Sequence, residues 1–423
     1  MIEVTFLKNK VTGQIHPGAR RLMLVNALRS IGQGMMVVDL ALYLDTLGWS
    51  TASIGGVLAA GGLLGVGLAP CIGIYSDRVG RKPFILFYEL LIAACALIGV
   101  LSTNFILLFI AITLSGFGKA DAGSPSPCAP AEHAWLATFI PPADRGKVYS
   151  INNALSFFGM AIGAVLAGTT ALWEKNLPEV LSFRPIFVFV FVLSLVTSSI
   201  ILTVKGGKPE RQQGVEEERI EKQDKKILRE ENTAVFKLAA INILNGMAIG
   251  LTGPMMSYWL SAKFGASNTQ IGSTLALTFF ATGVMSLFQA RLSYKHGNIR
   301  SIVLVRFMAS FLLILMPLLP TYALVSFVYI IRTALNRGTQ GAQQALSVSL
   351  TRDRRRGFAS SVNVLSMRLP TSIGPYITGF LFGLGSLSLP FYIASGLQFS
   401  FVYFYGKIFR AYDVRMKSHV SSG

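Results

Sequence analysis

The chain has 423 residues, of which 52% are hydrophobic and only 14% are charged, and its mean hydropathy is +0.55. Soluble globular domains carry about 25% charged residues, so this composition excludes a soluble protein and indicates that lipid is its solvent. The three cysteines, Cys71, Cys95 and Cys128, lie in apolar stretches without CxxC spacing, which argues against a disulfide framework or a zinc site. Residues 1–19 contain no long apolar core, so we expect no cleavable signal peptide, and the first span must direct insertion.

Apolar stretches long enough to cross a bilayer recur along the whole chain. A hydrocarbon core of about 30 Å is crossed by roughly 20 apolar helical residues. The predicted spans are 22–46, 53–75, 83–101, 104–132, 148–171, 185–204, 235–260, 269–294, 301–319, 322–346, 360–384 and 389–409. We expect the fourth to be interrupted, because Pro125, Pro127 and Pro130 lie within it.

The basic residues that give the net charge of +18 are unevenly distributed between the two sides of these spans. Lys and Arg concentrate before the first span, in the even-numbered loops and after the last span, whereas the odd-numbered loops carry only Lys175, Arg184 and Lys263. This asymmetry predicts a multi-pass inner-membrane protein with both termini in the cytoplasm. The positive charge therefore reports topology and contact with anionic lipid, and we expect no nucleic-acid partner.

The second half of the chain repeats the first. At offsets of 211 to 217 the matched residues include Asn26 with Asn242, Gly34 with Gly250, Ile54–Gly55 with Ile271–Gly272, and Asn152 with Asn363. Six spans copied in the same orientation predict two bundles that can move about a central site. We therefore divide the chain into bundles 1–204 and 234–423, joined by a charged cytoplasmic linker at 205–233. Two Glu–Lys pairs in the linker, Glu218–Lys222 and Glu221–Lys225, have the spacing that supports an exposed helix.

A polar turn between the second and third spans carries a recognisable pattern. Its residues are Gly73, Asp77, Arg78, Gly80, Arg81 and Lys82. Gly80 permits a tight turn, and the charges can bridge neighbouring helix ends. The pattern resembles the G-x-x-x-D-R-x-G-R-[RK] signature of the major facilitator superfamily. The resemblance implies an all-α membrane protein of two six-helix bundles, a secondary transporter with no cofactor, and a conformational switch at this turn. In that family an acid near the end of span four contacts the motif; here Thr138 stands at that place, and Glu132 is the nearest alternative.

Small residues form a second pattern in spans five and eleven, at Gly159, Gly163 and Gly168 and at Gly374, Pro375 and Gly379. The first set is similar to the glycine motif of proton-coupled exporters, with alanine in place of proline. Close helix packing by small residues explains the pattern equally well.

Charged and polar side chains within the spans are the candidates for solute and proton binding. The resemblance places spans one, four, seven and ten around a central cavity. The cavity candidates on these spans are Arg29, Gln33, Lys119, Asn242, Asn245, Arg332, Asn336 and Gln343. Their surplus of positive charge favours an anionic or zwitterionic solute.

Two carboxylates on these spans, Asp39 and Asp121, are the proton-coupling candidates, because burial and a nearby cation can shift a carboxyl group between its two protonation states. Glu132 with His133 is a weaker site near the cytoplasmic end, where solvation at a helix end is the alternative. Internal ion pairing, Arg29 with Asp121 or Asp39 with Lys119, is the alternative. For Glu89, Arg306 and Arg368, on spans three, nine and eleven, we expect pairing between helices.

The overall prediction is proton-coupled export of a drug-like or anionic metabolite by a monomer that binds solute and protons. Uptake symport of a small organic anion or sugar is the alternative within the same class. A membrane-embedded enzyme is disfavoured because the four histidines are scattered along the chain. An ATP-driven pump is disfavoured because the chain has no phosphate-binding G-x-x-x-x-G-K-[ST] loop.

The predicted topology can be tested by cysteine labelling in intact cells. A cysteine at Gln213, in the linker, should react only after the membrane is permeabilised, and a cysteine at Asn176 should react from outside. The unsubstituted protein, with its three native cysteines, gives the background. Labelling of position 213 from outside would overturn the assignment of every span.

Overall fold

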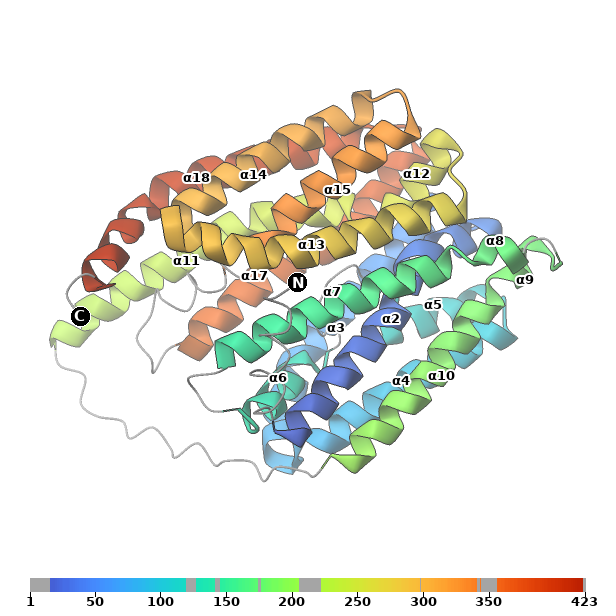
Figure 1. Ribbon diagram of the computed structural model, residues 1–423, viewed down its shortest axis with the longest axis horizontal. Coiled ribbons are helices and arrows are strands. Elements are labelled where there is room, and N and C mark those ends of the chain that lie inside the picture. Colours follow the sequence, from blue (N-terminus) through green and yellow to red (C-terminus); the bar gives the residue numbers. More distant parts are fainter. Residues whose placement is uncertain are drawn as a thin grey trace, which may run out of the picture.

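The computed structural model describes residues 16–118, 127–140, 145–173, 176–204, 222–296, 298–340, 343 and 356–420, and these residues are almost entirely helical. The N-terminal half comprises α2 (Pro17–Thr46), α3 (Thr51–Val79), α4 (Arg81–Leu101), α5 (Phe105–Ser115), α6 (Ala129–Ala137), α7 (Arg145–Ala167), α8 (Thr170–Trp173), α9 (Glu179–Ser182) and α10 (Arg184–Thr203). The C-terminal half comprises α11 (Lys222–Thr252), α12 (Met256–Phe264), α13 (Asn268–His296), α14 (Asn298–Leu315), the short 3₁₀ turn η2 (Met316–Leu318), α15 (Tyr322–Gly338), α17 (Arg356–Gly383) and α18 (Leu389–Val420). In Figure 1 the first half fills the lower part of the molecule and the second half the upper part.

The surface of the molecule is suited to lipid. Within the described residues, six helices are long and apolar enough to cross a membrane: Thr51–Gly73, Arg81–Leu101, Ile151–Trp173, Val180–Thr203, Glu231–Thr252 and Ile299–Leu318. Large apolar side chains point outward on both halves, among them Phe87, Phe311 and Phe327, which are 68%, 59% and 63% exposed. In water such a surface would drive aggregation, whereas in a bilayer it contacts acyl chains.

Two of the predicted spans, the fourth and the seventh, are each divided into two helices, at positions that the sequence did not predict. In span four, α5 ends at Ser115, because Gly116 adopts a left-handed conformation with φ +67° that terminates the helix well before Pro125. Span seven, which we predicted as continuous, is divided into α11 and α12 around Pro254. Proline has no backbone N–H to donate and clashes with the preceding turn, so the helix stops at Thr252.

The predicted linker lies partly within a helix. Residues 205–221 lie outside the described part of the chain, and residues 222–233 form the first turns of α11, ahead of the predicted span. At the other end of this half, α18 continues to Val420, beyond the predicted end of the last span at 409.

The sequence repeat corresponds to a repeat of helix contacts. A Cβ atom added at Gly34 of α2 would lie 2.2 Å from the carbonyl oxygen of Met160 on α7, and one added at Gly250 of α11 would lie 2.5 Å from that of Thr371 on α17. Polar contacts repeat as well, because Asn26 donates to Ser156 at 2.7 Å and Asn242 donates to Asn363 at 2.5 Å. Spans one and five therefore pack as spans seven and eleven do.

The predicted glycine motif lies at these contacts. Gly159 and Gly163 face backbone carbonyls of α2, and Gly374 faces the backbone of α11 at Gly250. Small residues let helix backbones approach this closely, so close packing accounts for the pattern. Whether the motif also marks an exporter stays a prediction.

The two halves meet at the end of the molecule where α2 terminates. Gly55 at the start of α3 faces the carbonyl oxygen of Pro375 on α17, and Gly272 at the start of α13 faces that of Ala164 on α7, with added Cβ atoms 2.2 and 2.6 Å from those oxygens. Gly379 and Gly168 lie in the same two interfaces, against Thr51 and Thr269. The molecule is thus closed between the halves at the end away from the start of α2.

The contact of α7 with α2 predicts a selective loss of stability. Gly163→Ala places a Cβ 2.0 Å from the carbonyl oxygen of Ile31, so the helices must separate, at a cost of about 1–3 kcal/mol. Gly67→Ala is the matched control, because nothing lies within 4 Å of its Cβ position and alanine favours a helix. Thermal unfolding in detergent should show a lower midpoint only for Gly163→Ala; equal midpoints would contradict the packing described.

Candidate functional site

The signature turn joins helix ends on the side where α2 begins. Gly80, with φ +112°, separates α3 from α4 as a single residue, as the sequence predicted. Arg81 donates to the carbonyl oxygen of Ala134 on α6 at 2.8 Å. Lys82 donates to the carbonyl oxygens of Leu202 and Val204 at 2.7 and 2.9 Å. Cations suit the unpaired carbonyl groups at a helix C-terminus, so the turn fixes α4 against the end of α10.

The expected acid contact of this motif stays a prediction. Arg81 binds a backbone carbonyl of α6, and the Glu132 side chain contacts Arg29. The side chains of Asp77 and Arg78 lie outside the described part of the structure, and their role in switching stays a prediction.

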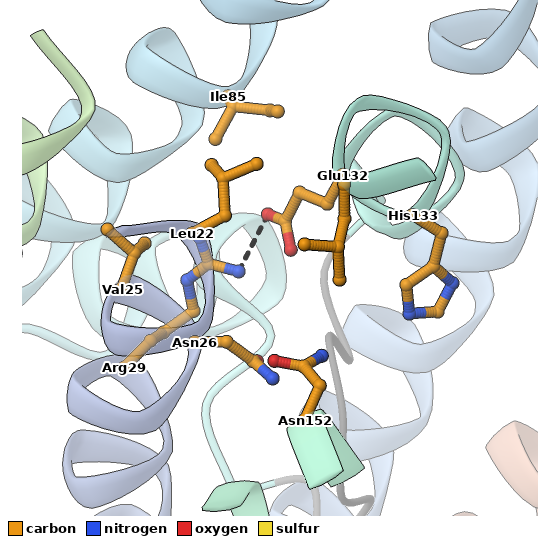
Figure 2. Close-up of a pocket in the computed structure, with 9 residues that line it drawn as sticks. Leu22, Val25, Asn26, Arg29, Ile85, Glu132, His133 and Asn152 are labelled. Atoms are coloured by element: carbon orange, nitrogen blue, oxygen red, sulfur yellow. Dashed lines mark hydrogen bonds and ion pairs between the residues drawn. The ribbon is translucent and has the colours of Figure 1, made fainter. Parts of the chain in front are cut away.

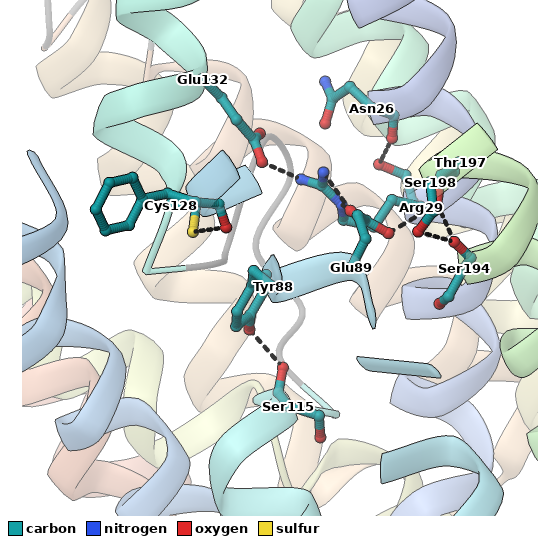
Figure 3. Close-up of polar contacts among 12 residues, drawn as sticks. Asn26, Arg29, Tyr88, Glu89, Ser115, Cys128, Glu132, Ser194, Thr197 and Ser198 are labelled. Atoms are coloured by element: carbon teal, nitrogen blue, oxygen red, sulfur yellow. Dashed lines mark hydrogen bonds and ion pairs between the residues drawn. The ribbon is translucent and has the colours of Figure 1, made fainter. Parts of the chain in front are cut away.

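A buried ion cluster lies where α2, α4, α6 and α10 meet. Arg29 of α2 donates through Nε to Glu89 of α4 at 2.5 Å, and its Nη2 contacts the same carboxylate oxygen. Its Nη1 donates to Glu132 of α6 at 2.7 Å. The second oxygen of Glu89 accepts from the hydroxyl of Thr197 on α10 at 2.7 Å. Figure 3 shows Glu132, Arg29, Glu89 and Thr197 as one continuous chain of contacts.

This arrangement confirms one expectation and leaves another as a prediction. The described partners of Arg29 are Glu89 and Glu132, whereas Asp121, which we considered as its partner, lies outside the described residues. The expected interhelical pairing of Glu89 is confirmed. The side chains of Arg29, Glu89 and Glu132 are 6%, 1% and 13% exposed. Such an ion pair persists in a low-dielectric interior only with close geometry and further hydrogen bonds, and Thr197 supplies one of these.

A small pocket reaches the exposed edge of this cluster. It is lined by Leu22, Val25, Asn26, Arg29, Ile85, Glu132, His133, Leu136 and Asn152. Figure 2 shows the Glu132 carboxylate, the Arg29 guanidinium and the two asparagine amides pointing toward it. The lining residues lie in the first turns of α2, α4 and α7 and in α6, so the pocket lies toward the same end as the signature turn.

Of the two predicted proton-coupling carboxylates, the structure describes only Asp39. Asp39 is 2% exposed, and its Oδ2 accepts from the Thr170 hydroxyl at 3.1 Å near the closed end. Asp121 and its possible neighbour Lys119 lie outside the described residues. Gln33, the remaining candidate on α2, lines a second small cavity on the other side of Arg29, together with Glu89 and Thr197.

In the C-terminal half a fully buried arginine organises four helices. Arg306 of α14 donates to Thr339 and Asn245 at 2.7 Å each, to Gln343 at 2.9 Å, and more weakly to the carbonyl oxygen of Asn336 at 3.4 Å. Its guanidinium carbon lies 4.7 Å from the ring centre of Phe401 on α18. Within the described residues these partners are neutral, so Arg306 does not form the acidic pair that we expected for it; its charge is solvated by amides, a hydroxyl and a π face.

Three predicted cavity residues belong to this network. Asn245 and Gln343 bind Arg306, and Asn336 donates to Gln398 of α18 at 3.1 Å. Asn242 lies against Asn363 of α17. All four are engaged within the C-terminal half in this conformation, and direct contact with a solute stays a prediction for them.

The ion cluster and the Arg306 network occupy equivalent places in the two halves. At the offset that relates Gly55 to Gly272, Glu89 corresponds to Arg306, and at the offset that relates Asn26 to Asn242, Arg29 corresponds to Asn245. The contact between Arg29 and Glu89 is thus repeated as the contact between Asn245 and Arg306. At this equivalent position the N-terminal half has an acid, Glu89, and the C-terminal half has a cation, Arg306.

A second arginine of the C-terminal half has unsatisfied donors. Arg332 of α15 is only 6% exposed, and within the described part of the chain its Nε and Nη2 have no hydrogen-bond acceptor. It lies close enough to Arg306 and Arg337 for electrostatic repulsion. A buried guanidinium whose donors lack acceptors is costly.

Comparison with known proteins agrees with this architecture. The sequence profile of the Major Facilitator Superfamily matches residues 22–237 and 238–415. The quinolone resistance protein NorA of Staphylococcus aureus is 22% identical over 372 residues, which cover 87% of this chain and 90% of NorA. The crystal structure of the nucleoside transporter NupG is similar with a TM-score of 0.70 at 14% identity, covering 93% of this chain and 99% of NupG. A bacterial homologue of the human lysosomal transporter Spinster, inward-facing and occupied, gives a TM-score of 0.71 at 15% identity, covering 92% and 95%.

The Arg306 network predicts that the several N–H donors of the guanidinium, and not its positive charge alone, are required for the stability of the fold. Arg306→Lys keeps the charge but cannot reach Thr339, Asn245 and Gln343 together. Because each charge-assisted hydrogen bond contributes about 1.5–3 kcal/mol, the thermal midpoint should fall clearly, while the exposed control Arg300→Lys should leave it unchanged. An unchanged midpoint for Arg306→Lys would contradict a structural role.

Proposed function

Because this chain belongs to the Major Facilitator Superfamily, we propose that it exports a small anionic or zwitterionic solute from the cell in exchange for protons. The family and the fold make it a membrane transporter that moves a small solute by secondary transport, and not an enzyme. The charge of the solute, the direction of transport and the coupling ion are the parts that we infer.

The proposal that the solute is anionic rests on one observation: two N–H donors of Arg332 have no acceptor among the described residues. Its unsatisfied donors lie on span ten, one of the spans that the family resemblance places around the central cavity. A carboxylate or phosphate group would supply the missing acceptors in bidentate geometry. Arg306 and Arg337 nearby add positive potential, so a cationic solute would be repelled from this region.

The direction of transport is inferred from sequence similarity and topology. The similarity to NorA, a quinolone resistance protein, favours export. If the termini face the cytoplasm, as the basic residues predict, the closed end between Gly55 and Pro375 faces outward. Acids buried in the N-terminal half provide groups that a counter-transported proton could occupy.

Arg332→Gln tests the solute class on purified protein. Thermal unfolding is followed with small carboxylates, organic phosphates, sugars and amines at two pH values. An anionic compound should stabilise the unsubstituted protein, and Arg332→Gln should weaken its binding at least about tenfold, equivalent to about 1.4 kcal/mol. Without ligand, Arg332→Gln should be as stable as the parent or more so, because it removes a buried guanidinium whose Nε and Nη2 have no acceptor among the described residues.

The control and the contrary results are distinct. Arg300→Gln removes an exposed arginine and should leave both ligand binding and stability unchanged. Stabilisation by amines or sugars alone, or full anion binding by Arg332→Gln, would contradict the proposed solute class. The direction is tested in everted membrane vesicles with the compound so identified. Accumulation driven by an acidic vesicle interior supports export by exchange, and accumulation driven by an acidic exterior indicates symport instead.

A further inference from the structure

We propose that a groove beside the start of α10 binds a phospholipid of the surrounding membrane, with the phosphate group on Arg184 and an acyl chain along α10. The inference goes beyond the transport of a solute, and the groove lies in the other half of the chain from Arg332. It assigns a lipid site to the end of the N-terminal half that lies opposite the signature turn.

The groove is formed where the short helix α9 meets α10, and its volume is about 560 Å³. This size lies within the range of small-molecule sites, roughly 300–1,000 Å³. Apart from one arginine, all of its lining side chains are apolar. The lining residues are Leu177, Leu181, Arg184, Pro185, Val188, Phe189 and Val192. The groove therefore offers a single cation beside an otherwise apolar surface, which is the combination that an anionic amphiphile requires.

The apolar wall of the groove continues along α10 as a stripe that faces lipid. Val188, Val192 and Leu195 are 44%, 49% and 40% exposed, and their spacing of four and three residues places them on one face of the helix. They belong to the segment Val180–Thr203, which is long and apolar enough to cross a bilayer. Acyl chains are the neighbours of such a stripe, so an acyl chain suits the apolar part of the groove.

The cation lies where a phospholipid head group would be. Arg184 is the first residue of α10 and is partly buried, and no hydrogen bond or ion pair joins its guanidinium to another described residue. The other end of α10 is bound by Lys82 of the signature turn, so Arg184 lies at the opposite end, beside α8 and α9 (Figure 1). Arginines near the ends of spans reach to the head groups, and a phosphate accepts two parallel N–H bonds from a guanidinium.

The corresponding helix of the second half lacks this cation. α18 begins with Leu389 followed by Pro390, as α10 begins with Arg184 followed by Pro185. Leu389 is 42% exposed, so at the same place of the repeat an apolar side chain faces outward. The scaffold therefore does not require a cation at this position, and contact with an anionic head group accounts for the arginine in the first half.

The opposite face of α10 at this level is packed against two other helices. Phe183 and Phe187 are buried, and their ring centres lie 5.6 and 5.2 Å from that of Tyr43 on α2. A Cβ atom added at Gly99 of α4 would clash with the Phe187 ring. A lipid in the groove adds apolar contacts on the outside of this packing. Because a ligand of the folded state stabilises it, phospholipid should raise the thermal midpoint of the protein.

Native mass spectrometry of the full chain, titrated with phosphatidylglycerol, tests the site. The unsubstituted protein should bind the first lipid more tightly than further ones. Arg184→Gln should weaken the first binding about tenfold, because a bidentate charge-assisted contact is lost. Val188→Trp keeps the cation but fills the groove, and it should weaken the first binding as well. Both side chains lie at the surface of the groove, so both variants should fold with unchanged thermal midpoints in detergent.

The control is Arg300→Gln, which removes an exposed cation that does not line the groove and should leave the first binding unchanged. Two further probes separate the parts of the lipid. Diacylglycerol with the same chains lacks the phosphate group and should bind the parent no better than it binds Arg184→Gln. Glycerol phosphate lacks the chains and should not displace the first phosphatidylglycerol.

Several results would overturn the proposal. These are equal first binding by the parent and Arg184→Gln, displacement of the lipid by glycerol phosphate at equal concentration, and equal weakening by Arg300→Gln. The last result would mean that lipid is attracted by positive charge in general. Binding of the anion at Arg332 is measured separately and should be the same in Arg184→Gln. If Arg184→Gln weakens that binding too, the groove belongs to the path of the solute and the lipid assignment is wrong.

Discussion

The constraint on which this structure depends is the low dielectric of the bilayer around the helices. A charge placed there is costly unless it finds partners. Arg29 meets this requirement with two carboxylates and Arg306 with neutral oxygens and an aromatic ring. Each of these side chains draws together helices that are distant in sequence. The buried charges therefore act as cross-links of the bundle as well as candidates for transport chemistry.

A second constraint is close backbone approach, which lets two copies of one scaffold fit together. Glycines at Gly34 and Gly250 bring α2 to α7 and α11 to α17, and Gly55 and Gly272 bring the halves against each other. At equivalent positions of the two repeats, the side chains have opposite charges, Glu89 in one half and Arg306 in the other. Symmetric packing of this kind allows two bundles to move about a central site.

The sequence predicted the elements of the fold well and the site only in part. Hydropathy located the spans because lipid demands long apolar helices, and the signature around Gly80 identified the family. Breaks at Gly116 and Pro254 were misplaced or missed, because a helix end depends on local backbone conformation. Among site residues, Arg29 and the interhelical pairing of Glu89 were predicted, whereas Glu132 was considered as a motif contact or a weaker proton site and not as a partner of Arg29.

The sequence by itself determined the solvent, the twelve spans, the repeat and the family, because these follow from composition and local patterns that each segment carries alone. Only the tertiary structure decided which charges meet. Arg29 could have paired with acids on several spans, and helical periodicity fixes the face of one helix but not the rotation of its neighbours. Packing of α4 and α6 on α2 selected Glu89 and Glu132, and it left Arg332 with donors that no described residue satisfies.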